Sequence, residues 1–131
     1  MGKTYYFIFV CLWAVIGCTT EPDQKKTLFI VKIDSLNHTP FVGLGDTLSI
    51  KLFGTVGTDG CHSFSHFEDL QQPLQLDLTV WGQKTSSEVC PTVMVYLNGK
   101  EFKSVATQQG WYRINIHQPD GSFLKDSIII K

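Results

Sequence analysis

Two histidines and two carboxylates stand close together in the segment His62-Ser-Phe-Ser-His66-Phe-Glu68-Asp69, and these side chains are the best placed for chemistry. On a helix, residues four apart share one face, so His62 and His66 would converge on one metal ion. On a strand they stand about 13 Å apart, at about 3.3 Å per residue, which is too far to share one zinc ion. The segment leaves both alternatives open, because Ser65-x-x-Glu68 is also the pattern of a helix cap. We favour the strand and therefore expect no metal and no other cofactor.

The sequence lacks the motifs of the common enzyme classes. It contains no Gly-x-Ser-x-Gly, no glycine-rich phosphate loop before a helix and no His-Glu-x-x-His. Glu68 and Asp69 are adjacent, so on a strand their carboxylates point to opposite faces, which is the wrong arrangement for an acid and base pair. We therefore expect that the protein is not an enzyme.

The four cysteines of this 131-residue chain separate by position. Cys11 lies in the uncharged apolar run 5–16, which follows Lys3. A membrane-spanning helix needs about 20 apolar residues, so this run is too short to span and has the length of the apolar part of a signal peptide. Cys18 ends the tetrapeptide Val15-Ile16-Gly17-Cys18 directly after the run.

The whole leader, with Lys3, the apolar run and the tetrapeptide, resembles the lipobox signal peptide of bacterial lipoproteins. Ile16 departs from the pattern, because Ala or Ser is commoner there. In that family the cysteine thiol carries a diacylglycerol, the leader is cut before it, and the new amino terminus is usually acylated. The resemblance implies a signal peptide at 1–17 and a permanent membrane anchor at Cys18. The alternative is an ordinary secretory leader with a leftover free cysteine.

Residues 18–27 hold this cysteine and a polar stretch with Pro22, which is typical of a flexible tether before a folded domain at 28–131. Glu21 and Asp23 resemble the acidic residues that some Bacteroidetes lipoproteins carry after the cysteine, where they accompany export to the cell surface. The alternative is an ordinary linker. The implied location is the cell envelope at the outer membrane, with its periplasmic and surface faces both open. Without the leader the chain has 10 basic and 12 acidic residues, and a net charge of −2 argues against nucleic acid as a partner.

Cys61 and Cys90 are the two cysteines that remain in an exported domain. Cysteines in an oxidising compartment are usually paired, so we expect a disulfide between them. Closing a loop of about 30 residues stabilises a domain by about 3–4 kcal/mol in the chain-entropy model. A redox pair is the alternative, but redox cysteines usually stand two residues apart at the start of a helix.

The composition after the leader favours strands. Ala106 is the single alanine there, whereas the β-branched residues Val, Ile and Thr are common. Apolar and polar residues alternate along four segments, and four more segments are weaker candidates: 48–52, 74–80, 93–97 and 112–116, then 28–34, 61–68, 101–106 and 123–130. Asn98-Gly99 is the strongest signal for a hairpin turn, and Pro119-Asp120-Gly121 is the next. About 7–8 short strands predict an all-β protein, an antiparallel β-sandwich.

The segment Gln108-Gln-Gly110-Trp-Tyr112-Arg-Ile114 resembles the Asp-x-Gly-x-Tyr-x-Cys stretch that opens the penultimate strand of immunoglobulin-like domains. In those domains the tyrosine hydroxyl bonds back to the backbone as a tyrosine corner. The resemblance implies an immunoglobulin-like β-sandwich in which Tyr112 is a structural residue. Ile114 stands where the family has a cysteine, which excludes the standard immunoglobulin disulfide.

A second resemblance covers residues 60–114. The stretches Gly60–Phe67, Val89-Cys90-Pro91 and Gly110-x-Tyr112-x-Ile114 are similar to those of small Bacteroidetes-type lipoproteins, which have an immunoglobulin-like domain and a cysteine pair at similar spacing. This group implies no agreed activity.

These features together predict a lipid-anchored module of the cell envelope that binds or assists without catalysis. We expect its partner to be an envelope protein or a glycan. The alternative function is a small envelope inhibitor of proteases, which would use Gly54–Gly60 or Gly82–Pro91 as its wedge.

Overall fold

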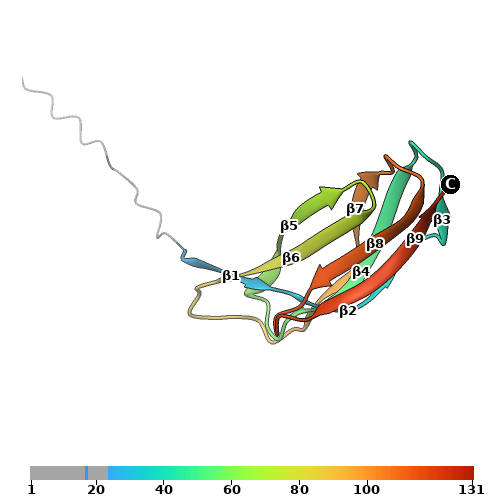
Figure 1. The fold of residues 1–131 in the computed structure, drawn as a ribbon. Coiled ribbons are helices and arrows are strands. Elements are labelled where there is room, and N and C mark those ends of the chain that lie inside the picture. Colours follow the sequence, from blue (N-terminus) through green and yellow to red (C-terminus); the bar gives the residue numbers. More distant parts are fainter. Residues whose placement is uncertain (1–16, 18–23) are drawn as a thin grey trace, which may run out of the picture.

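The computed structural model describes Gly17 and residues 24–131, so the predictions for Cys18, Glu21 and Asp23 concern residues outside the described part. Residues 24–131 form nine strands in one elongated body (Figure 1). The strands are β1 (Lys26–Ile30), β2 (Lys32–Asn37), β3 (Phe41–Val42), β4 (Thr47–Gly57), β5 (His62–Gln72), β6 (Gln75–Thr85), β7 (Val95–Val105), β8 (Gly110–His117) and β9 (Phe123–Ile130). Within the described residues, no helix is long and apolar enough to cross a membrane.

The strands form two sheets that pack face to face as a β-sandwich. In the six-stranded sheet, β5 pairs with one edge of β6, whereas β1 and β8 share its other edge and are followed by β9 and β3. The second sheet has the order β2-β4-β7. The predicted all-β, immunoglobulin-like β-sandwich is confirmed, with nine strands in the described residues where about 7–8 were expected.

Two strand pairs are parallel, β6 with β8 and β3 with β9, whereas the sequence predicted an antiparallel sandwich. β7 lies between β6 and β8 in the chain but belongs to the other sheet. The chain therefore crosses to the other sheet and returns before β8 begins. A crossover of this kind allows two strands of one sheet to run in the same direction.

The core lies between the two sheets and follows from the alternation of apolar residues. Along β6, Leu76, Leu78 and Val80 are fully buried, and the residues between them face outward. β4 and β8 repeat this pattern. Each buried aliphatic side chain stabilises the fold by about 1.5–3 kcal/mol relative to leaving it exposed. No polar or charged side chain is buried among the described residues, so the packing between the sheets is apolar.

Asn98 and Gly99 lie inside β7 and form no hairpin turn, so that prediction is wrong. β7 runs unbroken along β4 through this point, with Lys100 opposite Leu52 and Asn98 opposite Phe53. Gly99 is therefore the extra residue of a β-bulge, and its φ of +76° is a left-handed conformation that glycine adopts without steric strain. A bulge and a tight hairpin turn can require the same backbone conformation, which the dipeptide alone does not distinguish.

The structure confirms one other predicted turn and excludes the helix alternative. The hairpin at Pro119-Asp120-Gly121 is confirmed, because it joins β8 to β9 and Gly121 has a φ of +84°. The helix alternative that began near Ser65 is excluded, because His62–Gln72 is one strand. A hairpin at Pro73-Leu74, which the sequence analysis did not predict, joins that strand to β6.

The two ends of the sandwich differ in what they carry. β1 enters at one end, which we call the tether end, and Lys26 already pairs there with Thr85. The first strand therefore begins ahead of the domain boundary predicted at residue 28. The C-terminus, β3 and the first residue of β8 lie at the opposite end, which we call the far end (Figure 1).

Candidate binding face

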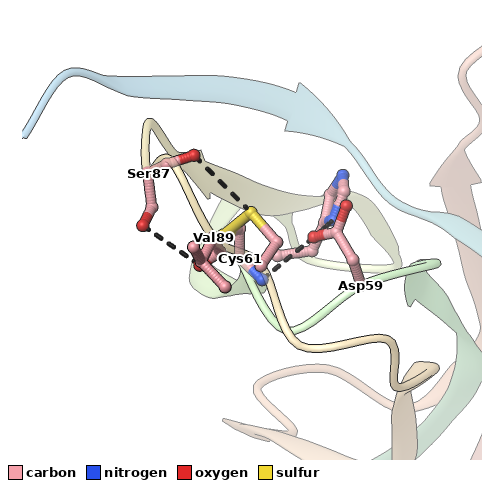
Figure 2. Close-up of a disulfide and its surroundings, with 6 residues drawn as sticks. Asp59, Cys61, Ser87 and Val89 are labelled. Atoms are coloured by element: carbon pink, nitrogen blue, oxygen red, sulfur yellow. Dashed lines mark hydrogen bonds and ion pairs between the residues drawn. A yellow bond between two sulfur atoms is a disulfide. The ribbon is translucent and has the colours of Figure 1, made fainter.

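The structure places the Sγ atoms of Cys61 and Cys90 1.95 Å apart, which is the distance of a disulfide, with their Cα atoms 5.3 Å apart (Figure 2). The pair joins the turn before β5 to the loop 86–94 between β6 and β7. The Gly60 N–H also donates to the Pro91 carbonyl oxygen at 2.7 Å, so a backbone hydrogen bond connects the same two segments. The predicted cysteine pair is thus seen, and it holds the 86–94 loop against the sheet.

Asp59 organises the turn beside the cysteine pair. Its Oδ1 accepts a hydrogen bond from the Cys61 N–H at 2.9 Å and one from His62 Nδ1 at 2.8 Å (Figure 2). Desolvation acts to raise the pKa of Asp59, but these hydrogen bonds and the charges of His62 and Lys84 outweigh it and hold the pKa below its usual value. Asp59 and the two sulfur atoms lie within 4.8 Å of one another, yet sulfur atoms bonded to each other offer no thiolate to a metal ion. With the disulfide formed, Asp59 and the two cysteines have a structural role.

The segments predicted as inhibitory wedges are shorter than expected. The first residues of Gly54–Gly60 and of Gly82–Pro91 belong to β4 and β6. The loop 86–94 remains at the surface, where Val89 is 79% exposed. Ser87 Oγ donates to the Val89 carbonyl oxygen at 3.1 Å, so this tip has a defined conformation (Figure 2).

β5 directs His62 and His66 to opposite faces of the sheet. Ser65 is the extra residue of a bulge opposite β6, and it shifts the alternation of side chains by one residue. His62 bonds to Asp59, whereas His66 stacks on Trp81 with ring centroids 6.2 Å apart. The structure therefore does not bring the two imidazoles together.

Tyr112 is 4% exposed and belongs to the core, as predicted. Burial raises the pKa of its hydroxyl, the negative charge of Asp69 raises it further, and the Ser104 side chain acts in the opposite direction. These neighbours are side chains, whereas the tyrosine-corner resemblance implied a backbone partner. Glu68 faces away from Asp69 and accepts a hydrogen bond from Nε1 of Trp81 at 2.7 Å, so these adjacent carboxylates serve opposite faces of β5.

The structure assembles a surface that no sequence motif predicts as a site, the outward side of the six-stranded sheet. Because the inward residues of β6, β8 and β9 fill the core, the alternate residues face solvent, and the strand register aligns them in rows. We call this surface the outer face. The residues of the outer face used below are Phe41, Gln75, Asp77, Trp111, Asn115, His117, Phe123 and Lys125.

The middle of the outer face is hollowed. A shallow, open cavity of about 330 Å³, which we call the central hollow, is lined by Gln75, Asp77, Asn115, His117, Phe123 and Lys125. Asn115 Nδ2 donates to Asp77 Oδ1 at 2.9 Å, and Gln75 Nε2 donates to Asp77 Oδ2 at 3.2 Å. The rings of His117 and Phe123 meet edge to face with centroids 4.5 Å apart. The hollow thus combines a carboxylate, an ammonium group, two amides and two planar rings.

Trp111 stands on the outer face between the central hollow and the far end. It is 64% exposed and lies beside Ile129, which in turn pairs with Phe41. The Nζ atom of Lys131 lies 4.4 Å from the centroid of the Phe41 ring. Trp111 and Asn115 are four residues apart on β8 and share a face, which separates them by about 13 Å at 3.3 Å per residue. Aromatic rings therefore lie both in the central hollow and beyond it toward the far end.

The outward orientation of part of this face can be predicted from the sequence. Arg113, Asn115 and His117 alternate with the core residues of β8, and the sequence analysis needed only that alternation to place them opposite the core. Gln75 and Asp77 alternate in the same way on β6. The parallel pairing of β6 with β8 brings the two sets together in one site. No local sequence pattern predicts that pairing.

The chain thus belongs to the class of all-β proteins with two packed sheets, with a cysteine pair at one end and a polar, aromatic outer face. No protein-family model, curated protein or solved structure matches it.

Proposed function

We propose that this chain is a non-catalytic binding or accessory module of the cell envelope, anchored by a lipid on Cys18, that recognises an envelope glycan or protein through the outer face. The observation that carries the proposal is Trp111, a large ring that is 64% exposed on the same face as the central hollow. Binding sites combine aromatic surface with a few placed polar groups, and an exposed tryptophan contributes a large contact area.

The composition of the central hollow supports binding rather than catalysis. Asp77 is the single carboxylate among its lining residues, whereas glycoside hydrolysis usually requires two. Both oxygen atoms of Asp77 already accept hydrogen bonds from the amides of Gln75 and Asn115. A carboxylate held in this way is suited to positioning a ligand.

The placement of the outer face supports an anchored module. Lys26, the first residue of β1, lies eight residues after Cys18, and a stretch of that length can reach about 27 Å when extended, at about 3.4 Å per residue. The central hollow and Trp111 lie along the sheet away from the tether end. A membrane attached through Cys18 would leave this surface free for a partner.

The proposal is tested with Trp111→Ala in the full-length protein. Its matched control is Tyr96→Ala, which removes a ring that is 60% exposed on β7 of the other sheet. Each protein is bound to envelope material isolated from the producing cells, either untreated, digested with protease, or oxidised with periodate. We expect Trp111→Ala to weaken binding by about tenfold and Tyr96→Ala to leave it unchanged. Equal binding by both variants, or no binding by the parent, would contradict the proposal.

One observation favours the second candidate, a protease inhibitor. Val89 is 79% exposed at the tip of the 86–94 loop, which the Cys61–Cys90 pair braces. A loop fixed in one conformation loses little entropy when it enters a protease cleft. This function predicts nanomolar inhibition of a cysteine or serine protease that Val89→Asp abolishes. Uninhibited proteases of both classes at micromolar protein would eliminate it.

A further inference from the structure

We infer that the central hollow holds one ring of a neutral glycan chain, with Phe123 packed against the sugar and Asp77 and Asn115 bonded to its hydroxyl groups. The inference rests on the proposed function and narrows its ligand to one chemical class. The polar network, the charge balance, the aromatic rings and the position in the sheet each support it.

The polar side chains of the hollow match the chemistry of sugar hydroxyls, each of which both donates and accepts. A carboxylate such as Asp77 has about four acceptor positions, and each amide offers two N–H groups and a carbonyl oxygen. The bonds from Asn115 and Gln75 to Asp77 use part of this capacity and leave the rest for a ligand. Because these bonds already fix the side chains, little conformational entropy remains to be lost on binding.

The two charged side chains that line the hollow, one negative and one positive, favour a neutral ligand there, whereas Arg113 lies next to Gln75 outside the lining. Asp77 carries the negative charge of its lining and Lys125 the positive charge, and the two residues flank Asn115 in neighbouring strands. An acidic sugar attracted to Lys125 would also be repelled by Asp77 at short range. Neutral hydroxyl groups can bond to both.

Phe123 provides the flat apolar surface that a sugar ring needs. Its side chain is 44% exposed, and the edge-to-face contact with His117 at 4.5 Å fixes its orientation. The C–H groups on one face of a sugar ring make it apolar, so that face can cover an aromatic ring while the hydroxyl groups at the rim reach polar partners.

Trp111 extends the site beyond one ring. It lies about 13 Å from Asn115 on the same face of β8, so that a chain seated in the hollow reaches it after further units. A single sugar would contact the hollow alone. The geometry therefore predicts tighter binding of oligosaccharides than of monosaccharides.

The position of the hollow argues against an extended peptide as its ligand. Peptides that add to a sheet bond to a free strand edge, whereas the hollow lies over β6, β8 and β9, whose neighbouring edges are paired with one another. Anchors at protein interfaces fill desolvated pockets, whereas this hollow is open to solvent and five of its six lining residues have polar side chains.

The test uses the full-length protein in a detergent without a sugar headgroup and an array of neutral and acidic oligosaccharides. The neutral oligosaccharide bound most tightly is then titrated against Phe123→Ala, Phe123→Tyr, Asp77→Ala and the control Asp34→Ala, whose side chain lies at a separate surface hollow beside Tyr96. We expect Phe123→Ala and Asp77→Ala to weaken binding by about tenfold or more, equivalent to about 1.4 kcal/mol. Phe123→Tyr keeps the ring and Asp34→Ala lies elsewhere, so both should stay within about twofold.

The outcomes separate the inference from the proposed function. Binding of acidic sugars alone, or of no sugar, overturns the inference, as does a neutral sugar whose affinity is the same for Phe123→Ala. If envelope binding still depends on Trp111 but is lost after protease and kept after periodate, the proposed function stands with a protein partner and the glycan inference fails. If Asp77→Ala lowers the unfolding midpoint, Lys125→Ala is measured instead, and unchanged affinity in that variant also contradicts the inference.

Discussion

Removal of the Tyr112 side chain should destabilise the sandwich by a large part of its total stability. The ring is 4% exposed and shares its face of β8 with Ile114 and Ile116, both fully buried. Truncating a buried aromatic side chain to alanine costs about 3–5 kcal/mol, because the lost contacts leave a cavity. Small domains have a free energy of unfolding of about 5–15 kcal/mol, so Tyr112→Ala should remove about a fifth of it or more.

Tyr112→Phe separates the ring from its hydroxyl group. The phenylalanine keeps the packing and loses the polar contacts near Asp69 and Ser104. A typical hydrogen bond contributes about 0.5–1.5 kcal/mol, so the loss should be much smaller than for alanine. The order of stability should therefore be parent, then Tyr112→Phe, then Tyr112→Ala.

Urea unfolding of residues 24–131, with the disulfide intact, measures these differences. At a slope of about 2 kcal/mol per molar urea, Tyr112→Ala should lower the midpoint by about 2 M and Tyr112→Phe by less than about 1 M. Tyr96→Ala is the control, because that ring is exposed and its removal should change stability by no more than about 0.5 kcal/mol. A Tyr112→Ala midpoint equal to that of the parent would refute the inward orientation of the ring and the register of β8.

The remaining predictions concern the anchor, the disulfide, one carboxylate and one bulge. Cys18→Ala should move the protein from the membrane pellet to the soluble or uncleaved fraction, and unchanged fractionation with a retained fatty-acid label would contradict lipidation. Peptide mass spectrometry without reduction should show Cys61 linked to Cys90, and reduction should lower the free energy of unfolding by about 3–4 kcal/mol; two thiols open to alkylation in the folded protein would contradict the bond. Asp59 has a lowered pKa in the fold, so its contribution to stability is present above its ordinary value of 3.8 and lost as pH falls through the folded value. Asp59→Asn should therefore lower the free energy of unfolding at pH 7 and have a smaller effect once the pH is below the folded pKa of Asp59. An equal loss of stability at acid pH, measured by thermal unfolding, would contradict this. Gly99→Ala should lower stability by about 1–2 kcal/mol because its φ is +76°, and an unchanged melt would mean that the bulge relaxes.

The inward faces of the strands could be predicted because burial in a sandwich repeats every second residue. Leu48, Ile50 and Leu52 alternate with polar residues in the sequence and are all buried in the structure. The same period predicted the burial of Tyr112 and Ile114 on β8. These residues needed no knowledge of which strands pair, because each strand carries its own pattern.

The β-bulges in the strands could not be predicted from the sequence, because a bulge depends on the partner strand. Gly99 is a bulge residue only because β4 continues past it on the other side of the ladder. Ser65 is the same case opposite β6, and it decides which face His66 occupies. A single-residue shift of this kind inverts every later side chain of the strand, so the fate of a histidine or carboxylate there depends on a distant segment.

The central hollow was beyond sequence analysis for the same reason. Asp77 and Asn115 are 38 residues apart and meet because β6 and β8 run parallel, with β7 in the other sheet between them in the chain. Alternation predicts that both residues face outward. It does not predict that a carboxylate and an amide on different strands share a hydrogen bond.

Both sheets carry an exposed ring on the outward side, Trp111 on one and Tyr96 on the other, but they differ in how their polar side chains are bonded. Around Glu101 on the three-stranded sheet, the carboxylate pairs with Lys103 at 3.6 Å and bonds to Ser49, an ordinary charged surface in contact with water. On the outer face of the six-stranded sheet, the amides of Gln75 and Asn115 bond to the carboxylate of Asp77 across β6 and β8. The core is complete without Trp111, and a large exposed ring adds an aggregation hazard without stabilising the sandwich. An exposed ring on the same face as hydrogen-bonded polar groups supports the binding function proposed above.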